Sequence, residues 1–260
     1  MSKDILVIDK VTRRFGGLMA LRSLSFSVAS GEIVGLIGPN GAGKTTAFNA
    51  VTGTVPPSSG TVTFNGKKIS GLAPSQIVVS GLVRTFQSTA SWAAETVAEN
   101  IYRGMLSRVN GSLVGKLVGR REDGLARDAL AAEIDDILAV TDLGAWRDSQ
   151  AGSLPYGLQK RLGIAIALAT RPRMLLLDEP AAGLNHEECN ELVALLRRLR
   201  DERGLTLLLV EHHMALVMAL CQRIVVLVQG EKIAEGTPQE IAQHPAVIEA
   251  YLGAPDYAHA

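Results

Sequence analysis

Apolar residues follow two patterns along this chain, and both patterns predict strands. Segment 24–30, LSFSVAS, alternates apolar and small polar residues with the period of a half-buried strand. Continuous apolar runs, typical of central strands that are buried on both faces, lie within segments 32–38, 174–180, 205–213 and 223–230. Helical segments separate the later runs. This alternation predicts an α/β fold with a mostly parallel sheet flanked by helices.

Turn signals and helical spacing predict the structure of the rest of the chain. Asn65 and Gly66 mark a tight hairpin turn, and residues 1–87 are predicted mainly as strands joined by turns. From about residue 92 to residue 153 the pattern changes, and ARDALAAEIDDILAVTDL carries apolar residues at helical spacing. We expect an N-terminal antiparallel β part and a helical lobe inserted into the core, with the Gly-containing segment 107–124 as a mobile connection inside the lobe.

Charge and cysteine usage limit the classes of partner and compartment. The 26 Lys and Arg residues balance the 26 Asp and Glu residues, so no global field attracts nucleic acid or an anionic membrane. Cys189 and Cys221 are far from any CxxC or His spacing, which argues against a zinc site or a disulfide framework and fits a reducing compartment. The N-terminus has no apolar signal core, and no window of about 18 residues is free of charge, so we expect a cytoplasmic protein.

The stretch GPNGAGKTT matches the phosphate-binding pattern G-x-x-x-x-G-K-[ST], and it stands between an apolar strand and a helix-like segment. Glycines let the backbone turn its N–H groups inward, where they and the helix N-terminus hold phosphate oxygens. Lys44 is expected to reach the β- and γ-phosphates, and the Thr45 hydroxyl to bind Mg²⁺. A Gly-rich turn without a ligand is the alternative, and the strand-loop-helix context argues against it. The candidate ATP-binding residues in this loop are Gly38, Pro39, Asn40, Gly41, Ala42, Gly43, Lys44, Thr45 and Thr46.

A second apolar strand, in MLLLDEP, ends in two carboxylates. Hydrolysis of a nucleotide needs a carboxylate for the metal and a group that orients water. Asp178 is placed for Mg²⁺, and Glu179, one residue later, is placed to polarise the attacking water. Adjacent carboxylates at a solvated strand end would be the alternative, and the phosphate-binding loop upstream disfavours it.

The order of these motifs, together with RTFQ, LPYGLQKR, AAGLN and VEHHM, is similar to that of ATP-binding cassette ATPases, the motor subunits of ABC transporters. The resemblance covers essentially the whole chain and implies a single P-loop NTPase domain of the cassette type, with ATP and Mg²⁺ as cofactors. We divide the chain into a nucleotide-binding core (1–91 and 154–236), a helical lobe (92–153) and a C-terminal helical tail (237–260). In that family two cassettes hold ATP between them head to tail.

The resemblance implies roles for four further residues. Phe15 resembles the aromatic residue that stacks on adenine, and Gln87 resembles the residue that senses Mg²⁺ and contacts the membrane subunit. His212 resembles the switch histidine at the γ-phosphate, although only the family's E-H-D pattern prefers it to His213. Phe15 as a core residue and Gln87 as an ordinary strand-end residue are the alternatives. Asn185 takes the place of the usual D-loop Asp.

Asn185 also has a local explanation. Glu188 follows it by three residues, and this spacing predicts a capping box at the start of a helix.

The family's signature motif, usually L-S-G-G-Q, is where this chain departs most. Pro155 replaces the Ser whose hydroxyl would bond the γ-phosphate, while the Gly157 backbone and the following helix N-terminus can still favour an anion. One charge-assisted hydrogen bond contributes roughly 1.5–3 kcal/mol, so its loss is expected to slow hydrolysis without abolishing it. Each signature completes the partner's ATP site, so a homodimer would have two weakened sites and a heterodimer one. The signature residues here are Leu154, Pro155, Tyr156, Gly157 and Leu158.

The flanking segments narrow the resemblance further. RRFGGLMAL, DEPAAGLN and PAVIEAYLGAP are similar to the LivG-type subunit of branched-chain amino acid importers. This similarity implies a cassette bound to the inner face of the plasma membrane. Its partners would be a second, LivF-type ATPase or a copy of itself, two membrane permeases and, indirectly, an extracytoplasmic solute-binding protein.

Other readings stay open at this point. Similar cassettes serve importers of urea, amides and organic acids, and lipopolysaccharide exporter cassettes share the helical lobe. A cassette ATPase that works on DNA or ribosomes is disfavoured, since the chain has no long coiled-coil insertion, second cassette or basic arm. Pro155 also motivates a nucleotide-binding subunit with little hydrolysis of its own.

Overall fold

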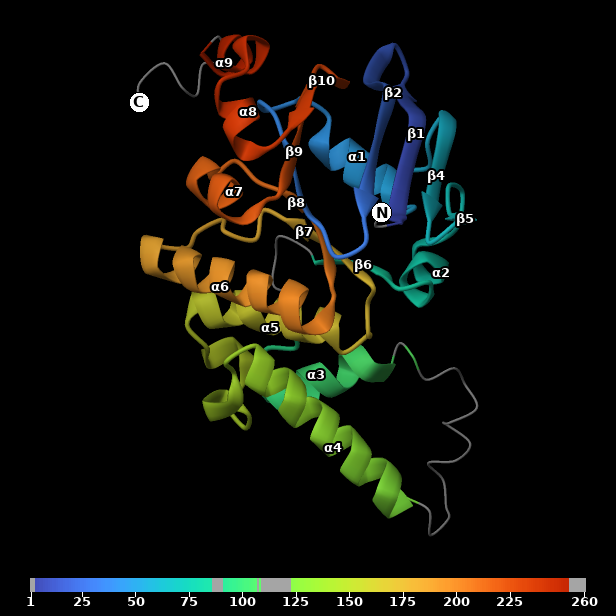
Figure 1. Ribbon diagram of the computed structural model, residues 1–260. Coiled ribbons are helices and arrows are strands. Elements are labelled where there is room, and N and C mark those ends of the chain that lie inside the picture. The colour runs from blue at the N-terminus through green and yellow to red at the C-terminus, as the bar shows by residue number, and fades with distance from the viewer. Residues whose placement is uncertain (1–2, 86–90, 107, 109–122, 253–260) are drawn as a thin grey trace.

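The structure, a computed structural model, describes residues 3–85, 91–106, 108 and 123–252. It contains two sheets (Figure 1). The smaller one is antiparallel and has the strand order β2 (Leu18–Ala29), β1 (Asp4–Phe15), β4 (Ser59–Phe64) and β5 (Lys67–Lys68). Asn65 and Gly66 join β4 to β5 with φ angles of 48° and 75°, which confirms the predicted tight turn.

The larger sheet has six strands, and five of them are parallel. The sixth, β10, pairs with β9 in the antiparallel sense. The strand order is β10 (Glu231–Gly236), β9 (Arg223–Val228), β3 (Ile33–Ile37), β8 (Thr206–Val210), β7 (Met174–Asp178) and β6 (Leu82–Thr85). The predicted mostly parallel sheet and the N-terminal antiparallel part are therefore confirmed.

Burial on both faces explains why the central strands are continuously apolar. Val34 and Leu208 pack with α1 (Lys44–Val51) and with the antiparallel sheet, so α1 lies between the two sheets. Ile33 and Leu207, one residue earlier on the same strands, belong to the core on the opposite face. That face is covered by α6 (His186–Arg203) and α7 (Met214–Leu220), and α8 (Pro238–Ala242) and α9 (Pro245–Leu252) follow β10.

A third hydrophobic cluster holds the helices at the lower end of Figure 1 together. It joins α3 (Val97–Leu106), α4 (Asp123–Val140) and one side of α5 (Tyr156–Leu168), with the short 3-10 helices η1 (Gly144–Trp146) and η2 (Ala151–Ser153) nearby. Gly104 allows α3 to approach α5 closely, because a Cβ there would lie 2.5 Å from the Ile166 carbonyl oxygen. The other side of α5 packs into the core of the parallel sheet through Ile164 and Ala167.

One element differs from the sequence prediction. Residues 74–79, in the region predicted as strands and turns, form α2 (Pro74–Val79). The helix is too short to show helical periodicity, and it buries Ile77 alone. The predicted mobile connection at 107–124 falls mostly outside the described residues. Among the described helices, none has the length and apolar character needed to cross a membrane.

Candidate nucleotide-binding site

The phosphate-binding pattern forms a tight loop between β3 and α1. Gly43 has a φ of 104°, and a Cβ on it would lie 2.6 Å from the Ala20 carbonyl oxygen, so only glycine fits there. The Ala42 N–H donates to the Pro39 carbonyl at 3.1 Å, and the Ala42 carbonyl accepts from Gly230 N–H at 2.9 Å. The loop is thus folded back on itself and tied to the turn after β9.

Lys44 is the first residue of α1 and is held against this loop. Its ammonium donates to the carbonyl oxygens of Gly38 at 2.6 Å and Pro39 at 3.0 Å. The side chain is buried, and burial lowers the pKa of Lys44, an effect that the negative charge of Glu179 partly offsets. An ammonium has three donors, so the two carbonyls fix its position and leave it able to donate to a phosphate oxygen.

Asp178 ends β7 beside an ion pair that the sequence analysis did not predict. The Arg84 guanidinium, on the neighbouring strand β6, donates to Asp178 Oδ2 through Nη2, and its Nη1 donates to Asn49 Oδ1 at 2.7 Å. Arg84 and Asp178 have side chains only 10% and 11% exposed. The guanidinium therefore links the strand before Gln87, the carboxylate of β7 and helix α1.

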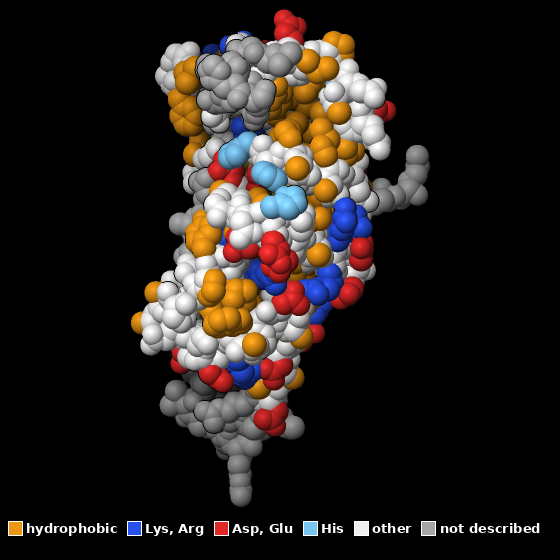
Figure 2. Space-filling view, turned by 90° about the vertical axis from the view of Figure 1, so that its left-hand side faces the viewer, with side chains coloured by type: hydrophobic (Ala, Val, Ile, Leu, Met, Phe, Trp, Pro, Cys, Tyr) orange, Lys and Arg blue, Asp and Glu red, His pale blue; other side chains and the backbone are white. Residues whose placement is uncertain are grey.

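Glu179 and His212 meet at the ends of two adjacent strands. Glu179 directly follows β7, and its carboxylate Oε1 lies 3.5 Å from His212 Nδ1 in the loop after β8. Its φ is 47°, a conformation that is uncommon outside glycine and that clusters at functional sites. Figure 2 looks at the side on which α6 and α7 lie in Figure 1, and histidine side chains gather there beside acidic ones.

Glu211, which precedes His212, is a second residue that the sequence analysis missed. Its side chain is buried, with 1% of the residue exposed. The carboxylate accepts hydrogen bonds from the N–H groups of Ala181 at 2.7 Å, His212 at 3.1 Å and His213 at 3.3 Å. A charged residue after an apolar strand is usually a solvated strand end, so no sequence signal indicated this burial.

The signature residues open α5 and pack on the loop that precedes α6. Pro155 is the N-cap of α5 and provides no side-chain hydrogen bond to the helix. The Tyr156 hydroxyl donates to the Ala182 carbonyl at 3.3 Å, and a Cβ on Gly183 would lie 2.9 Å from the tyrosine ring. Tyr156 thus holds the start of α5 against the segment that precedes α6.

Two local predictions can be compared with the structure, and a third concerns a residue that the structure does not describe. Asn185 caps α6 and forms the predicted capping box with Glu188, with both hydrogen bonds at 2.9 Å. Phe15 is 44% exposed at the end of β1, with the Arg13 guanidinium 4.6 Å from its ring centre, so it is not a core residue. Gln87 lies outside the described residues.

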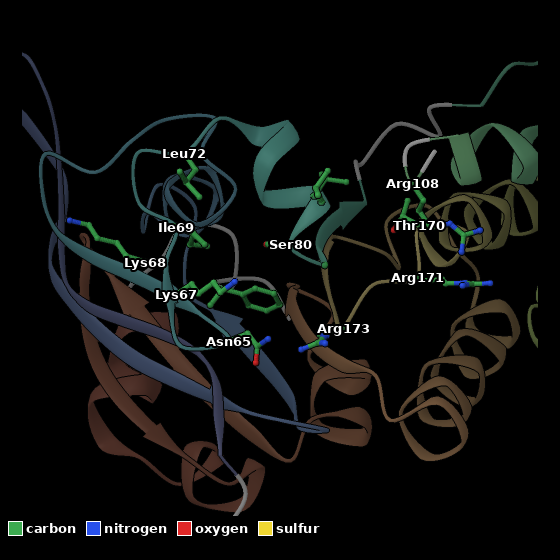
Figure 3. Close-up of a pocket in the computed structure, with 14 residues that line it drawn as sticks. Asn65, Lys67, Lys68, Ile69, Leu72, Ser80, Arg108, Thr170, Arg171 and Arg173 are labelled. Carbon is green, nitrogen blue, oxygen red and sulfur yellow. The ribbon is translucent and has the colours of Figure 1, made fainter. Parts of the chain in front are cut away.

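A pocket of about 610 Å³ lies elsewhere on the molecule (Figure 3). Its basic lining residues come from β5 and from the segments around α3 and β7, and they include Lys67, Lys68 and Arg173. It is walled by residues near the start of β6 and β7, whereas residues 38–46 lie at the opposite, carboxyl edge of the parallel sheet. It is therefore separate from the phosphate-binding loop.

Comparison with models of protein families identifies the family of this chain. Residues 21–182 match the model of the family described as ABC transporter, which is more than half of the chain. This chain belongs to the ABC transporter family of ATP-binding proteins. Residues 231–257 also match the model described as branched-chain amino acid ATP-binding cassette transporter.

Curated relatives and solved structures agree with this assignment. The chain is 42% identical over 257 residues to the high-affinity branched-chain amino acid transport ATP-binding protein BraF of Pseudomonas aeruginosa. It is equally similar, at 42% over 257 residues, to LivG of Escherichia coli, and both matches cover 97% of this chain and 99% of the relative. A crystal structure of the ADP conformation of an ATP-binding cassette of an ABC transporter superposes with a TM-score of 0.83 at 30% identity, covering 97% of this chain and 100% of that one.

The buried ion pair at Asp178 makes a testable contribution to stability. Arg84→Met removes the guanidinium and leaves a buried carboxylate without its ion-pair partner, which is expected to lower the free energy of unfolding by about 3–5 kcal/mol. The matched control is Arg171→Met, because Arg171 is 71% exposed in its pair with Glu133 and exposed pairs contribute at most about 1 kcal/mol. Denaturant unfolding without nucleotide measures both, and equal losses would contradict the assignment of Arg84 to a buried structural pair.

Proposed function

We propose that this chain is the ATP-hydrolysing subunit of an ABC transporter complex that imports branched-chain amino acids. The observation that carries the proposal is the meeting of the phosphate-binding loop, Asp178, Glu179 and His212 at one edge of the parallel sheet. The 42% identity to BraF and LivG over 97% of the chain supports the choice of solute. The match of residues 231–257 to the branched-chain amino acid family model supports it independently of the catalytic motifs.

Nucleotide binding is assigned to Phe15 and to residues 38–46. Phe15 presents an exposed ring on which adenine can stack. The inward-turned N–H groups of the loop and the N-terminus of α1 hold the phosphates, because both present partial positive charge. Lys44 adds a full positive charge at the β- and γ-phosphates, and its two hydrogen bonds to the loop hold it there before the nucleotide binds.

The residues present also fit a magnesium ion. Mg²⁺ prefers oxygen ligands, and the Thr45 hydroxyl and the Asp178 carboxylate supply them at the start of α1 and the end of β7. We assign the ion to these two residues and to Gln87. When bound, it would neutralise charge on the phosphates. Arg84 occupies one oxygen of Asp178 and so fixes the direction of the carboxylate.

Glu179 is assigned as the residue that polarises the attacking water, and His212 as the partner that contacts the γ-phosphate. The 3.5 Å separation of the Glu179 carboxylate from the imidazole allows both to face one small molecule. The Glu179 N–H donates a hydrogen bond to the Val210 carbonyl at 2.9 Å, and this bond holds Glu179 in its positive-φ conformation. The backbone of Glu179 is therefore anchored to the end of β8.

The site is completed by a second cassette. The signature residues, with the Gly157 backbone and the N-terminus of α5, are assigned to the γ-phosphate of the partner's ATP, and Asn185 to the contact between the two D-loops. ATP binding closes the pair, and hydrolysis reopens it. The movement passes through the Gln87 region and the helical lobe to two permeases. We place the chain on the cytoplasmic face of the membrane, with a LivF-type second ATPase and a solute-binding protein outside.

Substitution of Glu179 tests the hydrolytic mechanism. Glu179→Gln keeps the shape of the side chain but removes the base, so ATP should still bind while turnover falls and a closed dimer accumulates. Light scattering with and without ATP and steady-state phosphate release measure the two effects. Glu191→Gln, on an exposed carboxylate of α6 paired with Arg161, is the control and should behave as wild type. Normal turnover in Glu179→Gln would remove Glu179 from this role.

Uptake by cells tests the identity of the transported solute. In a strain whose only copy carries Lys44→Ala, uptake of labelled leucine should be lost, since the phosphates lose the cation that binds them. Lys232→Ala, at a surface lysine paired with Glu235, should leave uptake unchanged. Loss of urea or amide uptake with leucine uptake intact would show that the transporter imports one of the alternative solutes.

A further inference from the structure

We infer that Glu211 is a positioning residue of the ATPase: its buried carboxylate ties the loop after β7 to the loop after β8 and so keeps Glu179 and His212 in register. This inference rests on the roles proposed above for Glu179 and His212. It concerns a residue whose carboxylate acts through the backbone of its neighbours.

The hydrogen bonds of Glu211 divide between the two loops. Oε1 accepts from Ala181 N–H at 2.7 Å, two residues after Glu179. Oε2 accepts from the N–H groups of His212 at 3.1 Å and His213 at 3.3 Å. One carboxylate therefore fixes the backbone on both sides of the 3.5 Å contact between Glu179 and His212.

Only an ionised carboxylate suits this arrangement. All three donors found for it among the described residues are backbone N–H groups, and an ionised carboxylate is an acceptor at both oxygens. Hydrogen bonds to a charged acceptor are shorter and stronger than neutral ones. The negative charge also acts on a neighbouring thiol. Burial raises the pKa of Cys221 to about 12, and the charge of Glu211 is the second cause of this increase.

A neutral acceptor would not serve both loops. In Gln the amide oxygen can accept on one side, whereas the amide NH₂ would face an N–H donor on the other side. In Asp the charge is kept, but the shorter side chain cannot span the distance from the His212 backbone to Ala181. The two substitutions therefore break the link in different ways and test it separately.

The experiment compares Glu211→Gln, Glu211→Asp and Glu32→Gln in the full chain assembled with its partner cassette. Glu32 is the matched control: it is a largely buried carboxylate at the other edge of the sheet that accepts from Ala29 N–H at 2.9 Å and pairs with Arg223 at 2.8 Å. We measure kcat, the affinity for ATP, and amide hydrogen exchange at Ala181, His212 and His213.

Both Glu211 variants should lower kcat by about 10- to 100-fold, the loss expected when a catalytic group is misplaced by about 1 Å. ATP affinity should change less than about twofold, because phosphate binding belongs to residues 38–46. Exchange should accelerate at the one loop that faces the amide NH₂ in Glu211→Gln, and at Ala181 alone in Glu211→Asp. Glu32→Gln should lower stability and leave the kcat of the folded protein unchanged.

Three results would overturn the inference: wild-type kcat in a folded Glu211 variant, unchanged exchange at Ala181 in both variants, or an equal loss of kcat in Glu32→Gln. If Glu211→Gln does not fold, Glu211→Asp decides the question. Failure of the proposed function would look different, because Glu179→Gln would then turn over normally while Glu211→Asp still accelerated exchange at Ala181.

Discussion

Parallel pairing of three central strands is the constraint on which the site depends. In the register of the sheet, Val210 on β8 stands opposite Leu36 on β3 and opposite Asp178 on β7. The segments that follow these residues therefore leave the sheet at the same level and on the same edge. They are the phosphate-binding loop, the Glu179 loop and the His212 loop. A slip of one residue in any pairing would exchange the side chains packed on the two faces of that strand, so the close packing of both faces also fixes the geometry of the site.

Two buried charged groups then stabilise what the register brings together. Arg84 joins β6, β7 and α1 through Asp178 and Asn49 on the Asp178 side of the site. Glu211 joins the loops after β7 and β8 on the side of the Glu179–His212 contact. Because charges are costly to bury without partners, each is bound by several groups. Tyr156 extends the same rigidity to the signature loop through its contact with Gly183.

Features with a local cause were predictable from the sequence, and features that depend on register were not. The parallel strands, the turn at Asn65 and the capping box at Asn185 each follow from neighbouring residues. Arg84 and Asp178 are 94 positions apart, and nothing in either segment shows that their strands are adjacent. The burial of Glu211 likewise depends on the Ala181 backbone, which another strand delivers. The short helix α2 lacks the length that periodicity needs.

We propose that this chain is one half of a heteromeric ATP-driven motor. The most direct test is the ATPase rate of the purified chain alone and with a candidate second cassette, each compared with a Pro155→Ser variant. We expect the mixture to hydrolyse ATP far faster than the chain alone and Pro155→Ser to add little, because Gly157 and the N-terminus of α5 suffice. Turnover that appears only with Pro155→Ser would contradict it and would make the chain an ATP-dependent clamp with little hydrolysis of its own.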